Sequence, residues 1–218
     1  MNTSTLAMSA PNFIIALDWL GLAVFSITGA LVASRKRMDI VGFALLGSVT
    51  GIGGGTIRDV LLGNQPIFWI KQPAYLITCV SIASATFFFA HILQHRYRYL
   101  LWLDAIGLAL FAVTGAGNAY AHGAGSTISI AMGIATATFG GIIRDILGGE
   151  SPVILRQEIY ITAALIGATV FVALMDIGAP QDVAVALGFI AALALRSAGI
   201  RWGLTLPRYQ PKSGDQPN

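Results

Sequence analysis

The chain has 218 residues, of which 56% are hydrophobic and 11% are charged, and its net charge is +3. Soluble domains carry about a quarter charged residues, so this composition excludes an ordinary soluble domain and predicts an integral membrane protein. The basic residues lie in short clusters between apolar runs, which argues against a nucleic-acid partner.

Seven apolar segments between turn signals are the predicted membrane-spanning helices of an all-α protein. No Lys or Arg precedes Arg35. The first segment therefore lacks the basic start of a cleavable signal peptide, and we expect it to remain as a helix. The seven segments cover roughly residues 13–34, 40–62, 74–94, 101–121, 127–148, 159–176 and 183–200.

The basic residues gather on one side of the predicted topology, which fixes its orientation. If the N-terminus is outside, the inner segments are "RKRMD" (35–39), "HRYRY" (95–99), the turn with Arg156, and the C-terminal tail. Lys71 is then the single Lys or Arg in the outer segments, and the last outer loop is acidic. We therefore expect the N-terminus outside and the C-terminus in the cytoplasm.

A sequence repeat relates the two halves of the chain at a constant offset of 86 residues. "DWLGLAVFSITGA" from Asp18 matches "DAIGLALFAVTGA" from Asp104, and "GGGTIRD" from Gly53 matches "FGGIIRD" from Phe139. Each half holds three predicted spans, and three is an odd number. The second half must therefore cross the membrane in the opposite sense, as in the inverted repeats of transporters and some channels.

The predicted organisation has five parts. In inverted-repeat proteins the functional path lies at the interface between the repeats, and we expect it there; a duplication kept only for folding is the alternative. The parts are an extracytoplasmic N-terminus (1–12), a first three-helix repeat (13–95), a second, inverted three-helix repeat (100–178), a seventh transmembrane helix (183–200) and a cytoplasmic tail (201–218).

Two related segments, "GIGGGTIRDVLLG" (51–63) and "TFGGIIRDILGGE" (138–150), place glycines and charges inside apolar spans. Glycine weakens a helix, so both segments predict a kink or local unwinding. Unwound backbone at membrane depth must be buried in protein or line a wet cavity, and we expect an internal polar path here. The candidate kink and pore residues are Gly53, Gly54, Gly55, Gly140 and Gly141, with Ser48, Thr50, Thr136 and Thr138 as oxygen donors.

Charged candidates also recur in both halves. Adjacent residues on a helix point about 100° apart, so a pair between neighbours is not assumed. We expect Asp18 to contact Arg58 and, by symmetry, Asp104 to contact Arg144. The alternative is that both arginines only extend to the membrane interface. The charged pore or anchoring candidates are Arg58, Asp59, Arg144, Asp145, Asp18 and Asp104.

The doubled Gly-Gly-x-x-Arg-Asp pattern, the inverted three-span repeats and the seventh span resemble the prokaryotic branch of the trimeric intracellular cation (TRIC) channel family. The same family is also labelled a glycine transporter domain. The resemblance covers roughly residues 13–200. It implies a homotrimer in a prokaryotic inner membrane, with one K⁺-permeable pore in each protomer that is kinked at the glycine motifs. Phe139 replaces the first glycine of the second triplet, and we expect a milder kink or a constriction there.

Two functions remain compatible with the residues. In a channel, freed carbonyl and hydroxyl oxygens bind a partly hydrated cation, while aspartates favour cations. In a secondary transporter, Arg58 and the amide N–H groups after the glycines hold the carboxylate of a small zwitterion such as glycine. The resemblance favours the channel, and the transporter is the alternative.

No pattern in the sequence predicts an enzyme. The glycine segments lack the lysine of a phosphate-binding loop, and no nucleophile–base set lies in a span. His91, His95 and His122 lack metal-ligand spacing with acidic or thiol partners, so we expect no metal site, and the single Cys79 cannot form an intramolecular disulfide. We expect no cofactor beyond the permeating K⁺ or Na⁺, and the protein's surroundings are membrane lipids, with a bound lipid left open.

Overall fold

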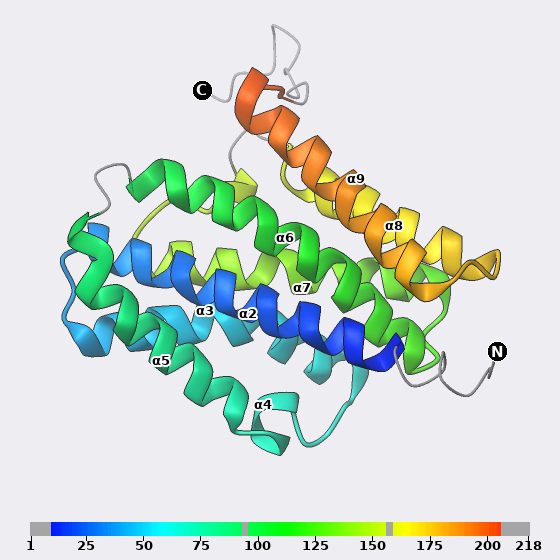
Figure 1. The fold of residues 1–218 in the computed structure, drawn as a ribbon, viewed down its shortest axis with the longest axis horizontal. Coiled ribbons are helices and arrows are strands. Elements are labelled where there is room, and N and C mark those ends of the chain that lie inside the picture. The colour runs from blue at the N-terminus through cyan, green and yellow to red at the C-terminus, as the bar shows by residue number, and fades with distance from the viewer. Residues whose placement is uncertain (1–9, 93–95, 156–158, 206–218) are drawn as a thin grey trace, which may run out of the picture.

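The computed structural model describes residues 10–92, 96–155 and 159–205 (Figure 1). This part of the chain is helical and of the membrane type. The α-helices are α2 (Ala10–Arg35), α3 (Ile40–Leu62), α4 (Phe68–Lys71), α5 (Ala74–Phe89), α6 (Arg96–Ala121), α7 (Ser126–Leu147), α8 (Ile161–Asp176) and α9 (Gln181–Trp202), and the 3₁₀ helices are η1 (Ala90–Ile92) and η2 (Val153–Leu155).

Each of the seven predicted apolar segments corresponds to one helix of 16 residues or more, and the short α4 lies in a predicted loop. Five of these helices, α2, α3, α6, α7 and α9, are long and apolar enough to cross a membrane. The apolar helices α5 and α8 have 16 residues each. At 1.5 Å per residue they are shorter than a bilayer core of about 30 Å.

The central layer of the fold is made of α2, α3, α6 and α7. Helix α2 packs on α3 and α6, and α7 packs on α3 and α6. Helix α5 covers α2 and α3 on one side, whereas α8 and α9 lie together beside α6 on the other (Figure 1). This layer contains the pair α3–α7, which carries both glycine segments.

Contacts in the central layer occur in pairs that follow the 86-residue offset. Gly21 packs on the ring of Phe111, and Gly107 packs on the ring of Phe25. The two rings meet edge to face at 5.1 Å between centroids. Glycine at both positions lets α2 and α6 approach closely, because an added Cβ would meet the ring at 3.0 Å or less.

The first and last described helices extend beyond the predicted spans 13–34 and 183–200. Helix α2 already includes Ala10, which lies inside the predicted N-terminal segment, and α9 continues to Trp202 before Gly203 closes it with a φ of 63°. Residues 1–9 and 206–218 lie outside the described part, as do His95 and Arg156 of the predicted inner segments.

Candidate functional site

Helices α3 and α7 cross at the two glycine segments. Gly54 lies against the backbone carbonyl of Thr136, and Gly140 lies against the backbone carbonyl of Thr50. These positions are paired by the repeat, and the order of the contacts shows that the helices run antiparallel. A Cβ at either glycine would clash with the opposite carbonyl, so the glycines permit a direct backbone contact.

Both helices are continuous through the glycines, so neither segment is unwound, and the expected kink stays a prediction. Helix α3 runs without interruption from Ile40 to Leu62, and α7 runs from Ser126 to Leu147. The glycine run is stabilised by packing on the facing helix, which explains why its low helix propensity does not break the helix.

The threonine hydroxyls at the crossing donate hydrogen bonds to backbone carbonyls of their own helices. The Thr50 hydroxyl donates to the Leu46 carbonyl at 2.5 Å, and the Thr136 hydroxyl donates to the Met132 carbonyl at 2.7 Å. Such a bond to the preceding turn bends a helix slightly. Thr138 makes the same kind of bond to the Ile134 carbonyl at 2.9 Å. The hydroxyl oxygens keep their acceptor capacity for a ligand.

The remaining candidates differ in their surroundings. Gly53 faces the end of the Ile143 side chain, whereas Gly55 lies against Phe68. Ser48 is buried, and its hydroxyl has no hydrogen-bond partner in the described part of the chain. Phe139 is 36% exposed. It lies on the surface of the chain and not at the crossing, so the geometry gives no support to the constriction that we expected there.

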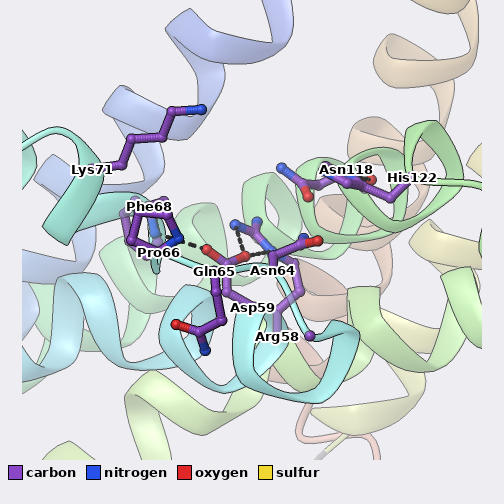
Figure 2. A pocket seen from close by; sticks show the side chains of 10 residues that line it. Arg58, Asp59, Asn64, Gln65, Pro66, Phe68, Lys71, Asn118 and His122 are labelled. Carbon is purple, nitrogen blue, oxygen red and sulfur yellow. Dashed lines mark hydrogen bonds and ion pairs between the residues drawn. The ribbon is translucent and has the colours of Figure 1, made fainter.

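Arg58 pairs with its own neighbour, contrary to the expectation from helix geometry. Its Nε and Nη2 donate to Oδ1 of Asp59 at 3.0 and 2.9 Å, and both side chains are nearly buried. The other carboxylate oxygen, Oδ2, accepts the backbone N–H of Phe68 at 3.0 Å (Figure 2). Asp59 therefore holds Arg58 on one side and the start of α4 on the other.

Arg144 repeats this arrangement in the second half. Its Nε and Nη2 lie 2.9 Å from Oδ1 of Asp145, and Oδ2 of Asp145 accepts the backbone N–H of Val153 at 3.0 Å. The long arginine side chain folds back toward the adjacent carboxylate, which overcomes the 100° separation of neighbouring positions. Each Arg-Asp pair thus braces the loop that follows its helix.

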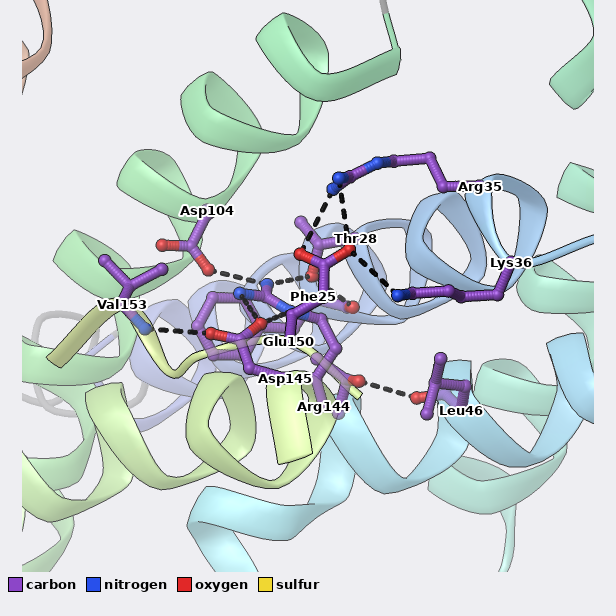
Figure 3. Close-up of polar contacts among 11 residues, drawn as sticks. Phe25, Thr28, Arg35, Lys36, Leu46, Asp104, Arg144, Asp145, Glu150 and Val153 are labelled. Carbon is purple, nitrogen blue, oxygen red and sulfur yellow. Dashed lines mark hydrogen bonds and ion pairs between the residues drawn. The ribbon is translucent and has the colours of Figure 1, made fainter. Parts of the chain in front are cut away.

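The arginines of the two halves differ in the partners that they have beyond the adjacent aspartate. Arg144 donates from Nη1 to Oδ1 of Asp104 at 2.7 Å and to the Thr28 hydroxyl at 3.1 Å (Figure 3). The predicted contact between Asp104 and Arg144 is therefore confirmed. We call Arg144, Asp104, Asp145 and Thr28 the Arg144 cluster. It is fully buried, with side-chain exposures of 0% for Arg144 and 1% for Asp104.

The predicted contact between Asp18 and Arg58 is wrong for this conformation. Across residues 10–92, 96–155 and 159–205, no ion pair joins these two side chains, and Oδ1 of Asp18 is buried without a hydrogen-bond partner. Both residues instead line a narrow cavity beside the crossing, together with Gly55 and Thr136. The Asp18–Arg58 and Asp104–Arg144 positions correspond in the repeat, but only the second pair forms an ion pair among the described residues.

A larger pocket of about 340 Å³ opens beyond Arg58 at the end of α3. Figure 2 shows Lys71 on one side of the Arg58–Asp59 pair and Asn118 and His122 on the other. We call it the Arg58 pocket. Its lining is polar and carries cationic groups, and it consists of Arg58, Asp59, Gly63, Asn64, Gln65, Pro66, Phe68, Lys71, Asn118 and His122.

Sequence reasoning missed Arg196, a charged residue inside the seventh apolar segment. Its side chain is 0% exposed, its guanidinium lies over the Tyr160 ring at 5.1 Å, and its Nη1 donates to the Ile159 carbonyl at 3.4 Å. The Tyr160 hydroxyl in turn lies beside Gly141. A single arginine in an otherwise apolar run was the available signal, since such residues face the protein interior.

Comparison with known proteins places this architecture in a family. A family model described as glycine transporter matches residues 15–91 and again residues 101–176, with starts 86 residues apart. The UPF0126 inner membrane protein YadS of Escherichia coli K12 is 42% identical over 195 residues, which is 88% of this chain and 94% of that protein. A UPF0126 membrane protein of Vibrio cholerae is 40% identical over 198 residues, which is 88% of this chain and 81% of that protein.

Solved structures extend the similarity to the three-dimensional fold. The TRIC channel orthologue from Rhodobacter sphaeroides is 66% identical, with a TM-score of 0.87, over 88% of this chain and 99% of that chain. A structure of a prokaryotic TRIC channel is 33% identical, with a TM-score of 0.81, over 89% of this chain and 98% of that chain. The protein is therefore a multi-pass plasma membrane protein that belongs to the glycine transporter (UPF0126) family, which is also the family of the trimeric intracellular cation (TRIC) channel structures.

Proposed function

We propose that the protein is a potassium-permeable channel for monovalent cations, built as a homotrimer with one pore in each protomer. The observation that carries the proposal is the α3–α7 crossing, where two helices touch through Gly54 and Gly140 without intervening side chains. Separation of these helices would expose backbone and threonine oxygens, which are suitable ligands for a partly hydrated cation. The structural neighbours of this chain are cation channels.

In this proposal the seven long helices all span the membrane, as two inverted three-helix repeats and a seventh helix. The N-terminus lies outside and the C-terminus in the cytoplasm. The Arg58 pocket then faces outward, and the Arg144 cluster faces the cytoplasm. The path is lined by Gly53, Gly54, Gly55, Gly140, Gly141, Ser48, Thr50, Thr136 and Thr138.

The arginines and aspartates act as braces of this path. Each aspartate already receives its arginine and a loop N–H group, so little of its charge is left to attract a permeating ion. Because Arg58 and Asp59 neutralise each other, Lys71 supplies the remaining positive charge of the Arg58 pocket, and a fixed positive charge beside the path raises the barrier for cations. We therefore expect a channel of low unitary conductance.

Recordings in planar bilayers test the proposal. Purified protein under a KCl gradient should give unitary currents that reverse near the K⁺ equilibrium potential. The measurement is repeated with the NaCl gradient of the same size and with a gradient of the chloride salt of a large organic cation. Absence of unitary currents in protein that remains trimeric by size-exclusion chromatography would contradict the channel function.

A secondary transporter of a small zwitterion is the second candidate, and the Arg58 pocket is the observation that favours it. The pocket offers Arg58 and Lys71 to a carboxylate and the side-chain amides of Asn64 and Asn118 to either charged group. In transporters that work by alternating access, the binding site is open to one side of the membrane at a time, and the Arg58 pocket lies at one end of the α3–α7 pair. Saturable uptake of glycine into liposomes, without unitary currents, would decide for this candidate.

A further inference from the structure

The two ends of the α3–α7 pair differ, although the repeat relates them to each other. At the end where α3 stops, Asn64 and His122 line the Arg58 pocket. At the end where α7 stops, the corresponding positions are occupied by Glu150 and Lys36. An amide and an imidazole occupy these two places at the end with the open pocket, while a carboxylate and an ammonium group occupy the equivalent places at the other end.

Glu150 receives two cationic side chains from the end of α2. Its Oε1 lies 3.1 Å from Nη2 of Arg35 and 3.8 Å from Nζ of Lys36, and its Oε2 accepts from Nη1 of Arg35 at 3.3 Å. Figure 3 shows Glu150 between the two cations. We call these three residues the Glu150 bridge. It joins the loop after α7, in the second half, to α2, in the first half.

Two more contacts hold the same helices together below the bridge. Gly148 packs on Val32, since an added Cβ would lie 2.7 Å from a Val32 methyl group. One helical turn deeper, Arg144 donates to the Thr28 hydroxyl. Helices α2 and α7 are therefore closed against each other from Thr28 to the Glu150 bridge, and the bridge is the layer that lies nearest to water.

We propose that Glu150 is a gating residue, and that the Glu150 bridge closes the ion path at the Arg144 end. This inference rests on the channel function proposed above. An ion that enters by the Arg58 pocket and passes the α3–α7 crossing can leave only after α2 and α7 separate at this end. Rupture of the Glu150 bridge is the first step of that separation.

The exposure of the Glu150 bridge suits a gate. The side chains of Arg35 and Lys36 are 30% and 37% exposed, whereas that of Glu150 is 14% exposed. Ion pairs near water are weak and exchange readily with solvent. Opening of the buried Arg144 cluster, by contrast, would leave buried charges without their partners, which is costly. The bridge can therefore break repeatedly without unfolding the protein.

The Glu150→Gln variant tests the proposal, because it removes the charge and keeps the side-chain volume. In planar bilayers at fixed KCl, its open probability should rise by about two- to fivefold, the range expected for loss of a partly exposed ion pair. The triple variant R35E/K36E/E150K restores opposite charges and should return the open probability toward the wild-type value. Asp182→Asn, which removes an exposed carboxylate at the start of α9, is the control and should leave it unchanged.

A labelling experiment reports on the gate without using currents. Val32→Cys is made in a Cys79→Ser background, so that the chain carries a single thiol. Val32 is 1% exposed beneath the bridge, and a cationic methanethiosulfonate reagent should label it slowly in nanodiscs. Adding Glu150→Gln should increase the labelling rate by about two- to fivefold, whereas adding Asp182→Asn should not.

The two experiments separate the gate from the channel function. If the wild-type protein gives no unitary currents, the channel function fails, and the labelling rate still decides whether Glu150 closes this end. If Glu150→Gln matches Asp182→Asn in open probability and in labelling, the gating role is overturned. It is also overturned if the charge-swapped triple variant remains as open as Glu150→Gln.

Discussion

Replacing Gly54 by alanine should destabilise the protein by about 1–3 kcal/mol or more, the usual cost of forcing extra volume into a packed interior. The new Cβ would overlap the backbone carbonyl of Thr136, which cannot rotate away as a side chain can. Helices α3 and α7 must then separate. Thermal unfolding of the detergent-purified protein measures the change in stability.

The same helix supplies a matched control in Gly53→Ala. Its new Cβ would lie 3.3 Å from the end of the Ile143 side chain, which can move, and 3.7 Å from the Gly140 Cα, which is an ordinary contact distance. Alanine also gains helix propensity of about 0.5–1 kcal/mol over glycine, so this variant should match or exceed the wild type. Gly140→Ala, which meets the Thr50 carbonyl, should follow Gly54→Ala. Equal stability of Gly54→Ala and Gly53→Ala would contradict the close crossing.

Asp104→Asn should destabilise the protein by about 1.5–3 kcal/mol, the contribution of a hydrogen bond to a charged group. Asp104 accepts the 2.7 Å bond from Arg144 inside the fully buried Arg144 cluster. The amide keeps the shape of the side chain but not its charge, so Arg144 keeps Asp145 as its only carboxylate partner among the described residues.

The repeat provides the control at Asp18, the counterpart of Asp104. Asp18 has no ion pair with Arg58 in the described part of the chain, and one of its oxygens is buried without a partner. Burial of an unpaired charge is costly, so Asp18→Asn should be neutral or stabilising. Unfolding temperatures of the two variants, measured side by side, test the asymmetry. A loss at Asp18 as large as that at Asp104 would show that the two ends are equivalent.

The helices and much of the site could be predicted from the sequence. Apolar runs and turn residues located the five helices long enough to cross a membrane and the shorter apolar helices α5 and α8, because apolar surroundings require apolar side chains. The offset of 86 residues also predicted which positions share an environment, and the contacts of Gly54 and Gly140 follow that offset. The Asp104–Arg144 pair was predicted in the same way.

The glycines show where a sequence pattern is ambiguous. A run of glycines weakens a helix, but it also lets another backbone come close. The choice between these outcomes depends on whether a partner helix is present at that depth. Here Thr136 and Thr50 present their carbonyls to the glycines, so the helices stay continuous. Only the packing of the whole molecule contains that information.

The asymmetry of the two ends could not be predicted from the repeat. Symmetric sequences predict symmetric contacts, whereas one conformation of an inverted-repeat protein has one end more closed than the other. Asp18 and Asp104 therefore differ although their local sequences agree. Glu150 ends the quoted segment 138–150, but its counterpart in the first half is the uncharged Asn64, so the repeat did not single it out. Arg35 was interpreted only as a marker of orientation.

Thiol modification at Thr136 tests most directly whether ions pass along the α3–α7 crossing. Thr136 lines the narrow cavity beside Asp18 and Arg58, whereas Leu45 is 59% exposed on the outer surface of α3. In a Cys79→Ser background, Thr136→Cys should give K⁺ currents in a planar bilayer that a cationic thiol reagent blocks. Currents of Leu45→Cys should not change. Thr136→Cys currents that persist after complete modification would contradict a pore at this crossing.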